Sequence, residues 1–337
     1  MKEAMFYRKL DNSRVACFLC AQSCRIDPGK RGLCGVRENR DGTLLTLVYG
    51  RLIAQNVDPI EKKPLFHFYP ATRSYSIATV GCNFRCLFCQ NADISQAPRE
   101  YNAIYGQTTA PEDVVAQAQK TRCATISYTY TEPTIFMEYA LDVARKAHEV
   151  DIRNVFVSNG YMTKEALETV SPYLDAANVD LKGYSDEFYS QQCGAHLKPV
   201  IKTLEGMKKR GVWLEVTTLL IPGLNDNPME LRQLAGFLAG LDPGIPWHIS
   251  RFHPTYRLTD RPSTPVKTLH MAREIGQEAG LHYVYTGNVP GDDGENTYCH
   301  QCKGMLIQRY GFSIQRRSLK EGKCLQCGTP LQGVGIV

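Results

Sequence analysis

The sequence has no long apolar run and no strong excess of charge of either sign. Its first residues, MKEAMFYRKLDNSR, lack the apolar stretch of an export signal, and no later run is long enough to span a membrane. The net charge of +5 is spread along the 337 residues and favours neither a membrane nor a nucleic acid, although a nucleic-acid partner stays open. There is no internal repeat or low-complexity tract. We therefore expect a globular cytoplasmic protein with no membrane partner.

Cysteine, by contrast, is abundant, with 13 residues. An odd number in a chain without an export signal argues against a disulfide framework and for metal binding. Only Cys123 and Cys193 stand alone, and the other cysteines fall into three groups. These are the N-terminal group (Cys17, Cys20, Cys24 and Cys34), the central group (Cys82, Cys86 and Cys89) and the C-terminal group (Cys299, Cys302, Cys324 and Cys327).

Strand-like and helix-like patterns alternate between the outer groups. The expected strands are residues 75–80, 124–128, 154–157, 177–181, 212–220 and 247–252, and the expected helices are 111–120, 134–150, 163–170, 198–210, 228–239 and 264–279. Such alternation predicts βαβ units and a parallel sheet, and six units are too few to close an eight-stranded barrel.

We therefore expect an α/β fold, a partial (β/α)6 TIM-like barrel over residues 71–289. A four-cysteine metal-binding segment at 1–70 precedes it, and a zinc-ribbon-like domain at 290–337 follows it.

The central group lies in the segment GCNFRCLFCQ, directly after the first expected strand. Cubane iron–sulfur clusters normally take four thiolates, and here the local fourth is missing. One iron would then keep an open coordination site for the amino and carboxylate groups of a ligand. A structural zinc loop with its fourth ligand elsewhere is the alternative, but the aromatic residue between the last two cysteines and the βα setting favour the cluster.

This CxxxCxxC motif on a βα barrel resembles the radical S-adenosylmethionine (SAM) superfamily. The loops are similar to those of the pyruvate formate-lyase activating enzyme-like branch, and the most similar group is the AmmeMemoRadiSam-system radical SAM enzymes. The resemblance covers about residues 14–290. It implies a [4Fe-4S] cluster that cleaves SAM reductively to a 5′-deoxyadenosyl radical, which abstracts hydrogen from a substrate. It also implies a reductant such as flavodoxin or ferredoxin.

The loops after the second and third strands carry residues that the resemblance assigns to the cofactor. Glu132 stands where the superfamily often has the carboxylate that contacts the methionyl amino group. The same residues also fit a helix start with Thr131 as N-cap. Ser158 and Asn159 resemble the Thr-Asn-Gly loop near the cofactor, although an ordinary Asn-Gly turn has the same sequence.

Later strand ends add five more candidates for the cofactor site. The resemblance places Asp180 at a ribose hydroxyl and Lys182 at the methionyl carboxylate, with a solvated surface pair as the alternative. Glu215 and Thr217 share one face of a strand, and a charge in an apolar strand needs a partner, so we expect both inside the barrel. His253 resembles a histidine near the cofactor in activating enzymes.

The remaining cysteines leave more than one interpretation open. Cys193 is a candidate hydrogen donor to a radical, but simple packing is favoured because buried free cysteine is common. The two CxxC pairs of the C-terminal group suit tetrahedral zinc, with an auxiliary iron–sulfur cluster as the alternative. The spacing of the N-terminal group does not decide between zinc and an iron–sulfur cluster.

Three functions are compatible with these patterns. The first is a radical enzyme that acts on a macromolecule, such as one that installs a glycyl radical on a partner protein. The second is the same chemistry on a small molecule or RNA, because fold does not fix substrate. The third, a non-catalytic metal-binding or electron-transfer protein, leaves the loops TEPT, SNG and DLK without a purpose.

Overall fold

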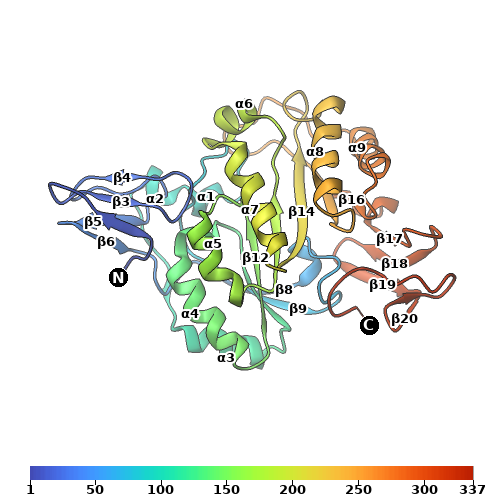
Figure 1. The fold of residues 1–337 in the computed structure, drawn as a ribbon, viewed down its shortest axis with the longest axis horizontal. Helices are drawn as coiled ribbons and strands as arrows, with labels where there is room; N and C mark the ends of the chain where they lie inside the picture. Colours follow the sequence, from blue (N-terminus) through green and yellow to red (C-terminus); the bar gives the residue numbers. More distant parts are fainter. Residues whose placement is uncertain (337) are drawn as a thin grey trace.

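A computed structural model of the protein describes residues 1–336. The chain forms three parts in a row, with a small β-rich part at each end of a central α/β part (Figure 1). The N-terminus belongs to one end part and the C-terminus to the other. The central part therefore has a cysteine-rich β structure on either side.

The central sheet has eight strands in the order β16-β15-β14-β13-β12-β11-β9-β8. Its strands are β8 (Ala54–Pro59), β9 (Arg73–Ala78), β11 (Thr125–Tyr128), β12 (Arg153–Ser158), β13 (Ala176–Asp180), β14 (Trp213–Leu220), β15 (Trp247–Arg251) and β16 (Val284–Gly287). All neighbours pair in parallel except β8, which runs antiparallel to β9. Because β8 and β16 are the two edges, the sheet is an open barrel, which confirms the expected fold class.

Helices connect the parallel strands and cover the outside of the sheet (Figure 1). They are α1 (Ala92–Ser95), α2 (Ala97–Glu100), α3 (Pro111–Lys120), α4 (Met137–His148), α5 (Lys164–Val170), α6 (Asp186–Phe188), α7 (Leu197–Lys209), α8 (Pro228–Leu241) and α9 (Val266–Glu278). In α7, for example, Val200, Leu204 and Met207 are buried on one face, which is the spacing of an amphipathic helix. No helix of the described chain has the length and apolarity that crossing a membrane requires.

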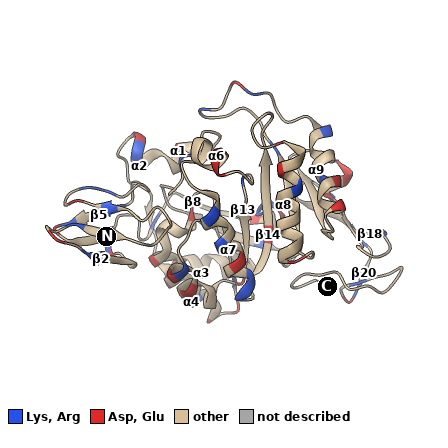
Figure 2. Ribbon diagram, turned by 45° about the horizontal axis from the view of Figure 1, so that its top comes forward, with Lys and Arg blue, Asp and Glu red and all other residues tan. Residues whose placement is uncertain are grey.

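Shorter helices complete the central part. The 3-10 helices are η1 (Ile60–Lys62), η2 (Pro133–Phe136), η3 (Ser171–Tyr173) and η5 (Asp293–Glu295), and η4 (Tyr189–Cys193) is a π-helix. Figure 2 shows basic and acidic residues interspersed along the helices, in keeping with the small net charge.

The two end parts are built from short antiparallel strands. The N-terminal part contains the sheets β1 (Lys2–Glu3), β6 (Thr43–Thr46), β5 (Arg37–Arg40) and β2 (Tyr7–Lys9), β3 (Val15–Cys17), β4 (Arg25–Ile26), and β7 (Arg51–Leu52) pairs with β10 (Gln107–Thr108). The C-terminal part contains β17 (Thr297–Tyr298), β18 (Met305–Tyr310), β19 (Ser313–Arg317) and the pair β20 (Leu319–Lys320) and β21 (Lys323–Cys324).

All six expected strands belong to the central sheet, but the sheet extends further at both edges. The short strand β16 adds a seventh parallel strand after the six expected ones. At the other edge, β8 joins the sheet although it precedes the expected domain boundary at residue 70. The barrel therefore recruits residues from the segment that we expected to be separate.

Candidate functional site

The loop between β9 and α1 carries the three cysteines of the central group and is held on two sides. Its backbone N–H groups at Arg85 and Leu87 donate to the carbonyl oxygens of Cys193 and Gln192, each at 2.9 Å. On the other side, Gly81 has φ +101°, and a Cβ there would come within 2.6 Å of a side-chain carbon of the N-terminal part. Only glycine fits this close approach in this conformation. The cysteine loop is thus fixed between the π-helix η4 and the N-terminal part.

The thiols of this loop lie in surroundings that suit a metal cluster. Burial raises the pKa of Cys82 and of Cys89, and a hydrogen bond with Cys193 together with burial raises that of Cys86. A bound metal cation removes such protons, because thiolates are the ligands. Between the first two cysteines, the buried Nδ2 of Asn83 has no hydrogen-bond partner within residues 1–336. This free donor and the three thiols, of which Cys86 is buried and Cys82 and Cys89 are half-buried, fit an iron–sulfur cluster with an acceptor-rich ligand.

Glu132 connects the loops that follow β11 and β12. Its carboxylate is buried and accepts hydrogen bonds from the Thr134 N–H at 3.0 Å, the Ser158 hydroxyl at 2.8 Å and the Asn159 N–H at 2.8 Å. Burial raises the pKa of Glu132, although these hydrogen bonds oppose the shift. The expectation that Thr131 is the N-cap is wrong, because Glu132 itself caps η2 through Thr134 N.

Asn159 brings the loop after β12 against the central cysteines. Its Nδ2 donates to Oδ1 of Asn83 at 2.7 Å and lies 3.8 Å from Sγ of Cys82. The segment Ser158–Gly160 is therefore more than a turn at a strand end, because it contacts the cysteine loop directly.

Asp180 and Lys182 form an ion pair at the end of β13, with Nζ 2.9 Å from Oδ2. The Lys182 side chain is only 16% exposed, and its Nζ lies 5.8 Å from the centre of the Phe88 ring in the cysteine loop. Burial by itself lowers the pKa of Lys182, but the neighbouring negative groups, Asp180 first, outweigh it and raise the pKa. Lys182 is thus enclosed beside the central cysteines, whereas the Asp180 side chain stays 35% exposed.

Cys193 ends the π-helix η4, and its side chain is fully buried. Packing was the favoured interpretation, but the Cys193 carbonyl also accepts from the Arg85 N–H in the cysteine loop, and the neighbouring Cys193 raises the pKa of Cys86. π-Helical turns are rare and frequent at functional sites. The sequence carries no spacing signal for this contact, because Cys193 is over a hundred residues away from Cys86.

The loop after β15 also reaches the cysteine loop, through the N–H of Arg257, which donates to the Leu87 carbonyl at 3.0 Å. His253, at the start of this loop, is exposed, and its Nδ1 lies 3.0 Å from the Ser263 hydroxyl. Its assignment to the cofactor stays a prediction, because the contacts of this side chain are local.

Glu215 lies inside the barrel as expected, but its contacts are not with the cysteine loop. Its carboxylate accepts hydrogen bonds from the N–H groups of Phe66 at 2.9 Å and His67 at 2.8 Å, and Nε2 of His248 lies 2.7 Å away. Burial alone would raise the pKa of Glu215, but His248 and His67 outweigh it and lower the pKa. We therefore assign Glu215 to holding the segment before β9 within the barrel, a different role from the predicted one.

Thr217 takes part in the same structural network. Its hydroxyl donates to Oδ1 of Asn178 at 2.9 Å, and Nδ2 of Asn178 donates to the Pro64 carbonyl at 2.7 Å. Glu215 therefore binds the segment 64–67 directly, whereas Thr217 reaches it only through Asn178.

Acid should weaken the fold at this segment, because burial lowers the pKa of His67 to about 4. Its Nδ1 donates to the Gln332 carbonyl at 2.6 Å, which requires Nε2 to accept from the Tyr285 hydroxyl. The unfolded chain binds a proton at this side chain near pH 6.5, and the folded chain does so only near pH 4. Stability is therefore lost as pH falls, by about 2 kcal/mol between pH 8 and pH 5.

Urea unfolding of the metal-loaded protein under argon at pH 8, 6.5 and 5 would measure this loss. The variant His67→Gln should have a shallower pH dependence by the same amount. Equal slopes in the two proteins would contradict the assignment to His67.

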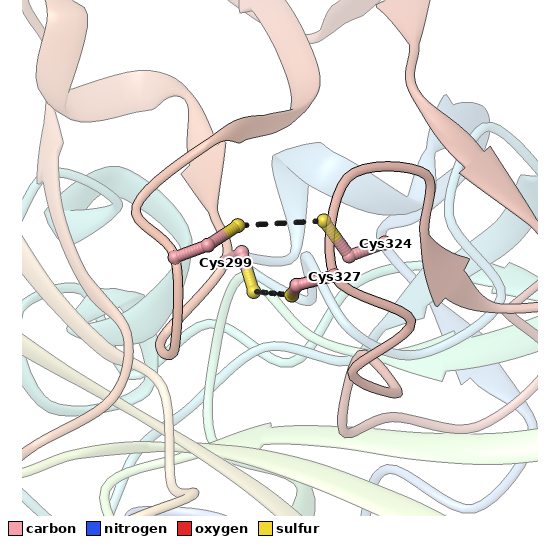
Figure 3. A group of neighbouring side chains, drawn as sticks. Cys299, Cys324 and Cys327 are labelled. Atoms are coloured by element: carbon pink, nitrogen blue, oxygen red, sulfur yellow. Dashed lines mark hydrogen bonds between the residues drawn. The ribbon is translucent and has the colours of Figure 1, made fainter.

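The C-terminal group forms a compact set of thiols. Sγ of Cys299 lies 3.6 Å from that of Cys327, and Sγ of Cys302 lies 3.6 Å from that of Cys324 (Figure 3). All four sulfurs lie within 4.8 Å of one another. Zinc–sulfur bonds of about 2.3 Å place the corners of a tetrahedron about 3.8 Å apart, so the group fits a single zinc ion.

The N-terminal group lines one small pocket between the N-terminal part and the barrel. Ile26, Ile135 and the buried Arg37 complete its walls. The four cysteines come together as the sequence predicts for a metal site.

Comparisons with known proteins agree with this site. A family profile described as the radical SAM superfamily matches residues 76–235. An uncharacterized protein of Methanocaldococcus jannaschii is 48% identical over 331 residues, which cover 97% of this chain and 98% of that protein. The 4-hydroxyphenylacetate decarboxylase activating enzyme of Clostridium scatologenes is 24% identical over 159 residues, which cover 46% of this chain and 50% of that enzyme. The chain thus matches about half the length of this activating enzyme.

A solved structure agrees on the fold. A radical SAM methyltransferase from Sphaerobacter thermophilus superposes with a TM-score of 0.52 and 18% identity, over 68% of this chain and 71% of that chain. At this identity the likeness shows the fold alone. The profile covers the end of β9, the cysteine loop and the loops of Glu132, Asn159 and Lys182. The chain therefore contains a radical SAM domain and is a radical SAM enzyme similar to activating enzymes.

Proposed function

We propose that the protein abstracts hydrogen from a glycine of a partner protein and so installs a glycyl radical. The observation that carries the proposal is the convergence of Glu132, Asn159 and Lys182, from three neighbouring strand ends, around the central group. The likeness to an activating enzyme supports a protein substrate over a small molecule or RNA.

The family implies an iron–sulfur cluster and SAM, and the residues present fit both. In this proposal the central group binds the cluster. When bound, the cluster supplies the electron that splits SAM into methionine and a 5′-deoxyadenosyl radical. The chain would bind and orient SAM: Glu132 and Ser158 hold the loops together, Lys182 would bind the methionyl carboxylate, and Asp180 would bind the ribose.

Contacts around the cysteine loop would also help to shield the site from water. The loop after β15 contacts the cysteine loop through Arg257, and the ring of Phe84 packs edge-on against Tyr161 at 5.0 Å. A radical that abstracts hydrogen from a substrate needs such shielding, because solvent and stray groups would otherwise quench it. These two contacts support shielding of the cysteine loop by its neighbouring segments.

Replacing Lys182 with methionine should weaken SAM binding. A hydrogen bond to a charged group contributes about 1.5–3 kcal/mol, which corresponds to roughly a 10–100-fold higher Kd. Equilibrium dialysis of the iron-loaded protein with labelled SAM would measure this change. Lys164→Met is the matched control, because Lys164 is 78% exposed on α5. An unchanged Kd in Lys182→Met, at an unchanged iron content, would contradict the role of Lys182.

The substrate class is tested by isotope transfer. The iron-loaded enzyme, dithionite and SAM are incubated under argon with a candidate glycyl radical protein deuterated at glycine. Deuterium in the 5′-deoxyadenosine and a glycyl electron paramagnetic resonance signal would support the proposal. Transfer from a small-molecule or RNA pool, with no protein-derived signal, would replace it with the alternative.

We further propose a zinc ion in the C-terminal group and a flavodoxin or ferredoxin as the electron donor. The short distances between the four sulfurs support the zinc ion. In this scheme the cysteine-rich parts at residues 1–70 and 290–337 are modules attached to the barrel at 71–289. Strand β8 lies within residues 1–70 but pairs with β9 in the barrel sheet.

A further inference from the structure

The N-terminal group differs from the C-terminal group in how far apart its sulfurs lie. Only the C-terminal group, within residues 1–336, has three or more ligand atoms that all lie within 4.8 Å of one another. The N-terminal group does not meet this limit, although its four cysteines line the same pocket. A single zinc ion needs sulfurs about 3.8 Å apart, so the N-terminal sulfurs are farther apart than one zinc ion requires.

The central group provides an internal comparison. Its three cysteines also lie outside the 4.8 Å limit. A cubane cluster carries one thiolate on each iron at its corners, so its protein sulfurs stand much farther apart than those around one ion. The N-terminal group therefore resembles the central group in this respect, and it has the fourth cysteine that the central group lacks.

A buried hydrogen-bond donor in the wall of the pocket also favours a cluster over a single zinc ion. Arg37 is 1% exposed, and its Nη1 lies 3.4 Å from Sγ of Cys17. It forms an ion pair with the equally buried Glu138, so the pair brings no net charge. The Nε of Arg37 is buried without a hydrogen-bond partner in the described chain. A buried donor of this kind is costly unless an acceptor meets it.

We propose that the N-terminal group binds a second [4Fe-4S] cluster, with four cysteine ligands and Arg37 as hydrogen-bond donor to its sulfur atoms. Hydrogen bonds to cluster sulfurs are a common means of setting the reduction potential. Cys17, Cys20 and Cys34 are buried and Cys24 is half-buried, which leaves one side of the cluster near the surface.

This second cluster lies directly beside the loop of the central group. Nε2 of Gln22 donates to the carbonyl oxygens of Asn83 at 2.9 Å and Gly194 at 3.0 Å. The carbonyl oxygen of Cys34 lies 3.1 Å from where a Cβ of Gly81 would stand. Gly81, directly before Cys82, therefore packs against Cys34 of the N-terminal group.

The contact gives the second cluster a function as an electron relay. A one-electron protein donor reduces the N-terminal cluster, which passes one electron to the oxidised central cluster and returns to its own oxidised state. This relay rests on the proposed function, whereas the presence of the cluster does not.

Metal analysis tests the cluster. After anaerobic reconstitution with iron and sulfide, the wild-type protein should hold about eight irons per chain, compared with about four if only the central group binds a cluster. Cys24→Ala, at the half-buried position, should lose about half of the iron and the matching Mössbauer signal. Cys123→Ala, outside all three groups, should lose none. About four irons with two zinc ions per chain would overturn the proposal, even if Cys24→Ala failed to fold.

The relay needs a separate measurement. In Cys24→Ala, the rate of 5′-deoxyadenosine formation should fall much more with reduced flavodoxin as the donor than with dithionite. Equal losses with both reductants would overturn the relay and leave a structural cluster. Eight irons in a wild-type protein that forms no 5′-deoxyadenosine would refute the proposed function and leave the second cluster standing.

Discussion

Cys86→Ala is expected to reduce 5′-deoxyadenosine formation by more than about 100-fold, because loss of an outer-shell partner alone typically costs a metal site 10–100-fold. Cys86 is the middle cysteine of the central group, and it is 7% exposed. Alanine removes one thiolate from a site that already lacks a fourth. The measurements are iron per chain and 5′-deoxyadenosine after reduction under argon.

The neighbouring thiol of Cys193 makes a second variant informative. Because the Cys193 carbonyl is hydrogen-bonded to Arg85, next to Cys86, its thiol is well placed to replace a lost ligand. The double variant Cys86→Ala, Cys193→Ala should therefore remove any activity that the single variant retains. Cys123→Ala is the matched control, since Cys123 is also buried but lies beside Thr121 on the far end of α3. Full activity in the double variant would contradict the enzyme assignment of the central group.

The sequence was most informative where chemistry and local pattern coincide. The three cysteines of the central group, Glu132 and Asn159 follow strands whose apolar runs are readable, and parallel strands bring their carboxyl ends to one edge. These side chains are in contact in the structure, through Asn83 and Ser158. Local order along the chain was thus sufficient to predict which loops meet.

Contacts between segments that are far apart in the chain could not be predicted from the sequence. Glu215 was expected inside the barrel because a buried charge needs a partner, but its partners Phe66 and His67 lie about 150 residues earlier. Strand β8 reads AQNVDP and alternates little, because the burial of its residues at the edge of the sheet does not alternate either. Neither the partners of Glu215 nor the strand β8 is marked by a periodic pattern of apolar residues in the sequence.

The same segment couples the C-terminal part to the barrel. Arg309 of β18 donates to the Phe66 carbonyl at 3.1 Å and lies over the Phe66 ring at 4.2 Å. His67 binds the Gln332 carbonyl. The residues that Glu215 holds inside the barrel are therefore also the docking site for the C-terminal part. Unfolding of the C-terminal part should therefore also destabilise the segment 66–67 and its contacts with Glu215.

Removing the metal of the C-terminal group is expected to unfold residues 290–336. This part is too small to rely on its apolar core, which is centred on Leu306 and Ile307. Structural zinc contributes on the order of 10 kcal/mol or more to the folding of such small domains. Cys302→Ala tests this directly, because Cys302 is exposed and its replacement costs metal ligation but little packing.

Limited trypsin digestion and zinc analysis would measure the result. Cys302→Ala should lose its zinc and be cleaved rapidly in the C-terminal part, where Lys303, Arg316 and Lys320 offer sites. Gln301→Ala, at the exposed neighbouring position, should keep zinc and resist cleavage. Because Arg309 and Gln332 anchor to the segment 64–67, the barrel of Cys302→Ala should also unfold at lower urea concentration. A zinc-free variant that resists trypsin as well as the wild type does would show that the apolar contacts alone hold this part together.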